Sequence, residues 1–191
     1  MVINLIKYPN NITKENNKNK ILNYANRGMS LEYEINESND YYLRKGLAII
    51  HKKPTPIGIV EQKNGKIIKA YFKEPSTTDY NGVYKGKYID FDAKETKSTT
   101  SFPISNIHPH QIKHLENVTK QKGIAFLIIR FTKLNKTYIL RANDLINFIN
   151  NNKRKSIPLK YFEEKGIKIK EKLAPRLDYI EALNIGEDKN G

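Results

Sequence analysis

The order of helix-like and strand-like segments predicts an α/β fold, with a mixed central sheet flanked by helices. Residues 31–42 carry apolar side chains at helical spacing, residues 88–94 alternate as a strand does, and Ile124–Ile129 is a short apolar run of β-forming residues. Helical segments come before, between and after the strands along the chain. We therefore expect helices on both faces of the sheet.

The N-terminal half begins with residues 1–25, which lack an apolar period and are expected to form a flexible arm. Ser30 is a suitable N-cap for a helix that carries acidic residues in its first turns and ends at Gly46. The polar segment 75–87 is predicted to be the extended tip of a hairpin. Strands are predicted over residues 47–50, 67–72 and 88–94.

The C-terminal half predicts a helix over His108–Gln121, then two strands and a short helix that ends at Ile149. The run Ile124–Ile129 is apolar throughout, so we expect a central strand that is buried on both faces. A chain of 191 residues favours one compact domain, which we assign to residues 26–176. The acidic residues 177–191 are interpreted as a C-terminal tail.

The chain carries 34 Lys and Arg against 20 Asp and Glu, a formal net charge of +14. Residues 44–73 hold eight basic residues and one acidic residue, and residues 151–176 hold nine and three. A lysine-rich proteome from an AT-rich genome explains part of this excess. Basic clusters also release counterions when they meet phosphates, so the blocks favour a nucleic-acid partner.

Two other classes of protein are excluded by the sequence. No run approaches the roughly 20 apolar residues of a membrane span, so no membrane partner is expected. The absence of cysteine excludes disulfide frameworks and thiolate zinc sites, and it agrees with a cytoplasmic protein.

Two aspartates and a lysine form the strongest candidate site. Asp79 lies in the polar segment, while Asp92 and Lys94 are two residues apart on one predicted strand and therefore point to the same face. Paired carboxylates bind Mg²⁺, and an ammonium beside them can stabilise a pentacovalent phosphorane. The alternative is a solvated sheet face on which these charges have no chemical role.

A second motif, His110-Gln111-Ile112-Lys113-His114, places two histidines one helical turn apart. The zinc-protease motif has a glutamate general base where this sequence has Gln111, so that chemistry is not expected. A solvated or phosphate-facing pair of histidines is the preferred interpretation. The sequence also lacks the glycine-rich phosphate-binding motifs of nucleotide-binding folds.

Five segments resemble, in order, the RecU family of Holliday-junction resolvases. The longest runs from Ser76 to Lys97 and includes Asp79, Asp92 and Lys94. The resemblance implies a restriction-endonuclease-like PD-(D/E)xK core in a homodimer that makes paired nicks in a four-way DNA junction, with Mg²⁺ as the cofactor. The other matching segments are residues 26–29, 51–56, 100–103 and 110–112.

The resemblance also implies roles for single residues. Thr77, Asp79, Asp92 and Gln111 correspond to Mg²⁺ ligands, and Lys94 corresponds to the transition-state stabiliser. The family usually has glutamate at the second acidic position, where this chain has the shorter Asp92. We hypothesise an altered metal preference, with Mn²⁺ able to substitute because it tolerates looser geometry than Mg²⁺.

The expected DNA contacts also follow from the resemblance. Residues 73–87 resemble the projecting stalk that the family inserts at the junction centre. Tyr80 and Tyr84 are expected to stack on unpaired bases, and Lys85 and Lys87 to contact phosphates. Further candidate contacts are Arg27, Lys52, Lys53 and the block 153–172.

Three functions remain open from the sequence. The first is a Mg²⁺-dependent endonuclease that resolves four-way junctions in recombination and repair. The others are a non-catalytic junction-binding or strand-annealing protein, and a PD-(D/E)xK nuclease with another DNA substrate. The resemblance adds RecA and the branch-migration machinery as partners, and a nucleoid-associated location. Glu34 or Glu37 is left open as a further acid near the metal.

Overall fold

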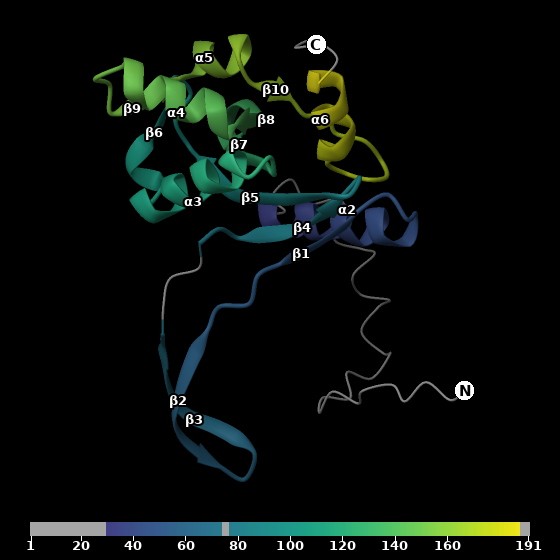
Figure 1. Cartoon of the computed structure of the whole chain (residues 1–191), viewed down its shortest axis with the longest axis vertical. Helices are drawn as coiled ribbons and strands as arrows, with labels where there is room; N and C mark the ends of the chain where they lie inside the picture. Colours follow the sequence, from purple (N-terminus) through teal and green to yellow (C-terminus); the bar gives the residue numbers. More distant parts are fainter. Residues whose placement is uncertain (1–29, 74–76, 188–191) are drawn as a thin grey trace.

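A six-stranded sheet with the strand order β1-β4-β5-β7-β8-β10 forms the centre of the molecule (Figure 1). The structure is a computed structural model, and it describes residues 30–73 and 77–187. β5 and β7 pair in parallel and the other neighbours pair antiparallel, which confirms the predicted mixed sheet. The strands are β1 (Ile49–Lys52), β4 (Tyr80–Tyr84), β5 (Lys87–Thr96), β7 (Ile124–Phe131), β8 (Lys136–Arg141) and β10 (Ile167–Lys168).

Helices cover both faces of the sheet, as predicted. Along β7, Phe126 and Ile128 belong to one core, whereas Leu127 and Ile129 belong to the other. β7 is therefore the central strand, buried on both faces, that the apolar run predicts. The first core is covered by α2 (Leu31–Arg44) and α6 (Tyr179–Glu187), and the second by α3 (Pro109–Lys120), α4 (Ala142–Asn151) and α5 (Leu159–Glu164).

Local sequence signals explain where α2 and α3 begin. The Ser30 hydroxyl caps α2 by accepting a hydrogen bond from the Tyr33 N–H at 3.3 Å. Pro109 occupies the first turn of α3, where its missing N–H costs nothing, and His108 is the N-cap. Before α3 comes β6 (Ser101–Pro103), which pairs with β9 (Ser156–Pro158) in a small separate sheet.

A two-stranded ribbon, β2 (Ile57–Lys63) and β3 (Lys66–Phe72), projects away from the layered domain (Figure 1). We call residues 57–72 the projecting hairpin. Its turn, Asn64-Gly65, has both residues at positive φ, as a two-residue hairpin turn requires. Gly58 alone is buried among residues 57–71, so the hairpin presents its side chains to solvent.

The predicted stalk at residues 73–87 is therefore misplaced, and the projecting element lies before it. Residues 80–84 form β4, which lies between β1 and β5 inside the sheet. A two-residue turn, Lys85-Gly86, joins β4 to β5. The polar composition of this segment predicted a hairpin tip, whereas it contains a strand whose Tyr80 and Tyr84 side chains lie in the core.

The boundary predicted at residue 177 is also wrong. Leu177, Tyr179, Ile180 and Leu183 are all buried in the core that α2 covers. The excess of acidic charge in this segment concealed an apolar face at helical spacing. Residues 177–187 therefore belong to the domain rather than to a tail.

Candidate active site

The register of β4 and β5 brings Asp79 and Asp92 together. Tyr80 pairs with Phe91, so Asp79, one residue before β4, lies opposite Asp92. An Asp79 carboxylate oxygen accepts a hydrogen bond from the Ala93 N–H at 3.3 Å, which holds the aspartate against β5. Lys94 lies on the same face, and its Nζ is 2.5 Å from Asp92 Oδ1. The structure thus brings together the two carboxylates and the ammonium that the sequence singles out.

Asp92 occupies an electrostatically unfavourable position. Its side chain is fully buried. Burial first, and the neighbouring Asp79 carboxylate second, raise the pKa of Asp92 to about 7, although Lys94 opposes the shift. Two carboxylates and one ammonium lie together here, so the three groups carry a net negative charge when ionised. A cation would compensate that charge, and the oxygen donors suit a hard divalent ion.

Gln111 also reaches this site from the first turn of α3. Its Nε2 donates a hydrogen bond to Asp92 Oδ2, while its Oε1 accepts one from the His108 N–H at 3.0 Å and closes a capping box. The amide nitrogen, rather than the oxygen, therefore faces Asp92 in this arrangement. Gln111 joins α3 to the strand that carries the candidate catalytic residues.

Thr77, the remaining predicted metal ligand, lies on the segment that leads into β4. Its side chain is exposed, and its Oγ1 accepts a hydrogen bond from Lys53 Nζ at 3.0 Å. Glu34, left open as an additional acid, lies elsewhere. It forms a buried ion pair with Arg130 and a second pair with Arg176 at 3.2 Å, in the core on the other face of the sheet.

Several predicted DNA contacts are wrong, because the residues are inside the protein. Tyr80 is fully buried and stacks on Phe91 at 4.9 Å, and Tyr84 is only 5% exposed and donates a hydrogen bond to Asn184. Neither ring is available to stack on a base. The two tyrosines are core residues of β4.

The predicted basic contacts divide into two groups. Lys85 and Lys87 are exposed at the turn between β4 and β5, and Lys52 is exposed in an ion pair with Glu32. The Lys53 side chain is only 15% exposed and its ammonium bonds within the protein, so we reassign it to internal contacts. Arg27 lies outside the described residues.

The histidine motif on α3 does not form a metal-binding pair. His114 Nε2 lies 3.1 Å from a carboxylate oxygen of Asp90, whereas the His110 ring stacks on His108 at 5.4 Å. In residues 30–73 and 77–187, no group of three or more His, Asp or Glu side chains forms a candidate metal cluster. The candidate donors therefore remain the two facing aspartates and their amide and hydroxyl neighbours.

Asp90 is the site residue that sequence reasoning missed. It precedes Asp92 by two positions on β5, so it shares the face that carries Asp92 and Lys94. It is fully buried and accepts hydrogen bonds from several side chains. The alternation of charged residues at 90, 92 and 94 was a signal that could have found it.

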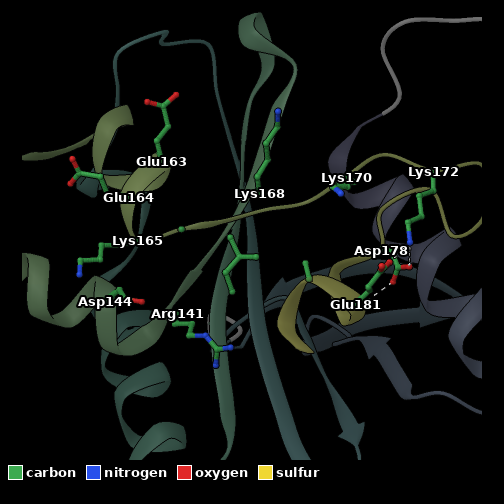
Figure 2. A pocket seen from close by; sticks show the side chains of 13 residues that line it. Arg141, Asp144, Glu163, Glu164, Lys165, Lys168, Lys170, Lys172, Asp178 and Glu181 are labelled. Atoms are coloured by element: carbon green, nitrogen blue, oxygen red, sulfur yellow. Dashed lines mark hydrogen bonds and ion pairs between the residues drawn. The ribbon is translucent and has the colours of Figure 1, made fainter. Parts of the chain in front are cut away.

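A separate cavity of about 580 Å³ lies near the β10 edge of the sheet, and Figure 2 shows its lining side chains. Five basic and five acidic residues line it, so it has no net charge to attract a polyanion. Lys172 bridges Asp178 and Glu181 across part of it. The charged lining is Arg141, Lys165, Lys168, Lys170, Lys172, Asp144, Glu163, Glu164, Asp178 and Glu181.

The fold and site define a mixed α/β protein in which an Asp-x-Lys strand faces a second carboxylate. Comparison with known proteins identifies its family, because a model described as "RecU: Recombination protein U" matches residues 26–185. The chain belongs to the RecU family, as the resemblance in its sequence predicts. None of the helices among the described residues has the length and apolar character needed to cross a membrane.

Individual relatives are similar over most of their length. The Holliday junction resolvase RecU of Pediococcus pentosaceus is 54% identical over 169 residues, 84% of each chain. That of Streptococcus sanguinis is 49% identical over 94% of each chain. The solved structure of Hjc, a Holliday junction resolvase from Archaeoglobus fulgidus, has a TM-score of 0.41 and 9% identity, covering 70% of this chain and 94% of that one.

Proposed function

We propose that this protein is a metal-dependent endonuclease that resolves four-way DNA junctions by paired nicks. The observation that carries the proposal is the convergence of Asp79, Asp92 and Lys94 on one face of the sheet. Relatives covering most of the chain bear the name Holliday junction resolvase, which supports the substrate. The basic composition of the chain suits a phosphate-rich partner.

Asp79 and Asp92 would hold a divalent ion, with Thr77 and Gln111 as the further ligands that the family resemblance implies. Gln111 would bind the ion through Oε1, after its amide turns away from the His108 N–H. The excess negative charge of the buried Asp92 and the half-buried Asp79 beside it supports this assignment. A bound Mg²⁺ supplies a water of lowered pKa and neutralises charge on the scissile phosphate. Mn²⁺ would substitute, because the shorter Asp92 suits an ion that tolerates looser geometry.

The residues of the chain itself have distinct tasks in this proposal. Lys94 holds its ammonium beside Asp92, where it stabilises the negative charge that builds up on the phosphate during attack. Gln111 fixes the orientation of the Asp92 carboxylate through its amide nitrogen. Asp79 is held against β5 by the Ala93 N–H, so both carboxylates are arranged before the substrate arrives.

The projecting hairpin takes over the junction contact that the sequence analysis assigned to residues 73–87. Ile59, Val60, Ile68 and Tyr71 are between 53% and 58% exposed on it. A two-stranded ribbon with exposed apolar side chains is marginal alone, so we infer that these side chains contact unpaired bases at the crossover. Lys52, Lys85 and Lys87 are available for backbone phosphates.

Paired nicks on opposed strands require two active sites, and each chain offers one candidate site. We therefore propose a homodimer in which each subunit cuts one strand. RecA and the branch-migration machinery are further proposed partners, in keeping with recombination. Chromosomal DNA as the substrate would associate the protein with the nucleoid in the cytoplasm.

The decisive experiment compares a synthetic four-way junction with linear duplex DNA, each with and without Mg²⁺. We expect symmetric nicks in the junction only, at least 100-fold reduced in Asp79→Ala and Lys94→Ala, in line with the loss of about 3 kcal/mol of transition-state stabilisation. Lys120→Ala is the matched control, because it removes the same charge from an exposed position on α3.

Two results would contradict the proposal. Wild-type protein that binds junctions but never cuts them would establish the non-catalytic DNA-binding function. Equal cutting of the linear duplex would establish a nuclease with another DNA substrate.

A further inference from the structure

Asp90 lies two residues before Asp92 and is fully buried, yet the proposed mechanism does not use it. Its Oδ1 accepts a hydrogen bond from the Thr78 hydroxyl. Its Oδ2 accepts from Lys53 Nζ at 2.8 Å and from the Tyr88 hydroxyl at 2.7 Å, and lies 3.1 Å from His114 Nε2. One carboxylate thus gathers four side chains, which fills about all the acceptor sites of its two oxygens.

The Lys53 ammonium makes all its hydrogen bonds inside this cluster. An ammonium has three N–H donors. In the structure they reach Thr77 Oγ1 at 3.0 Å, Thr78 Oγ1 at 2.5 Å and Asp90 at 2.8 Å. The Lys53 backbone N–H also donates to the carbonyl of Asp79 at 2.8 Å. Lys53 therefore holds three consecutive residues, 77–79, through its side chain and its backbone.

These contacts join the three segments that supply the candidate site. Thr78 belongs to the segment that carries Asp79, Asp90 lies on the strand that carries Asp92, and His114 lies on α3 one turn after Gln111. The segment before Tyr80 lies outside the β4–β5 ladder, so the hydrogen bonds between those two strands do not fix it. The position of Asp79 depends instead on its own contacts and on those made by Lys53 and Thr78.

We propose that Asp90, with Lys53 and Thr78, is a positioning residue that sets the separation of Asp79 and Asp92 for the metal ion. We call these three residues the clasp. This inference rests on the proposed function, because it assumes that Asp79 and Asp92 hold a divalent ion. Lys53 neutralises Asp90, so the clasp acts through geometry and leaves binding of the ion to the two other carboxylates. Outer contacts of this kind typically change metal affinity or activity by about 10- to 100-fold.

The test measures Mn²⁺ binding to the DNA-free protein by calorimetry. Asp90→Asn keeps the size of the side chain but puts an amide in place of one of the oxygens that accept hydrogen bonds. We expect its Mn²⁺ affinity to fall by about 10- to 100-fold. Thr78→Val keeps the shape of the side chain and replaces the hydroxyl with a methyl group, and we expect about a 10-fold loss at the lower end of that range. This second variant keeps the proposal testable if Asp90→Asn does not fold.

Glu34→Gln is the matched control, because Glu34 is also a buried carboxylate paired with cationic side chains, on the opposite face of the sheet. It is expected to lower the melting temperature without changing the affinity for Mn²⁺. Junction binding in the presence of EDTA is expected to stay within about 2-fold of wild type in Thr78→Val, since the basic surface is unchanged.

The outcomes separate the two levels of the proposal. Wild-type protein that binds no Mn²⁺ would overturn the metal site itself. If the wild type binds Mn²⁺ and both Thr78→Val and Asp90→Asn bind it with the same affinity, the clasp alone is overturned. In addition, we combine Lys53→Met with Asp90→Asn. The double variant is expected to lose no more Mn²⁺ affinity than the more damaging of the two single variants, because either substitution alone already disrupts the clasp. Fully additive losses would contradict a shared role.

Discussion

Replacing Asp92 with asparagine is predicted to stabilise the metal-free protein at neutral pH while abolishing cleavage. The pKa of Asp92 is raised from 3.8 to about 7, mainly by burial and then by Asp79. The folded protein therefore binds a proton that the unfolded chain releases, and the free energy of unfolding falls as the pH rises between these two values. About 3 pKa units correspond to about 4 kcal/mol at most.

The assay is urea unfolding in EDTA at pH 5 and at pH 8. From pH 5 to pH 8, the free energy of unfolding of the wild type is expected to fall by about 3 kcal/mol relative to that of Asp92→Asn, because this range covers most of the interval between the two pKa values. Adding Mg²⁺ at pH 8 should restore the stability of the wild type only. An equal difference in stability between wild type and Asp92→Asn at both pH values would refute the reasoning, because it would mean that ionisation of Asp92 does not destabilise the folded protein.

Asp178 provides a control of the opposite sign. Burial raises its pKa, but hydrogen bonds from Lys172, the Glu181 backbone N–H and the Tyr42 hydroxyl outweigh burial, so the net pKa is lowered. Its stabilising contribution is present above the ordinary carboxyl pKa and is lost as the pH falls below it. Asp178→Asn should therefore cost more stability at pH 8 than at pH 3.

Three further predictions concern metal preference, the projecting hairpin and the packing of β4. Asp92→Glu should raise the ratio of Mg²⁺- to Mn²⁺-supported junction cleavage, because the longer acid restores the reach of the family's usual glutamate. Ile59→Ser with Ile68→Ser should weaken junction binding in gel-shift titrations, with no fall in melting temperature, since both side chains are exposed. Gly82→Ala should destabilise the fold by about 1–3 kcal/mol in urea, because the added Cβ would lie 2.0 Å from the Ile49 carbonyl oxygen.

The sequence alone was sufficient where a local pattern decides the outcome. Ser30 and the apolar spacing after it predict α2, and the unbroken apolar run Ile124–Ile129 predicts a strand buried on both faces. The separation of Asp92 and Lys94 by one residue places both on one face of any strand. These features depend on neighbours within a few residues, so no knowledge of the rest of the fold is needed.

Tertiary structure alone decided which strands are neighbours and which polar residues are buried. β4 is polar in sequence, and only its pairing with β1 and β5 shows that Tyr80 and Tyr84 are core residues. Lys53 looks like a surface lysine until Asp90, 37 residues away along the chain, is found beside it. Such contacts join segments that are far apart in sequence, so no local pattern encodes them, and the arrangement around Asp79 and Asp92 depends on them.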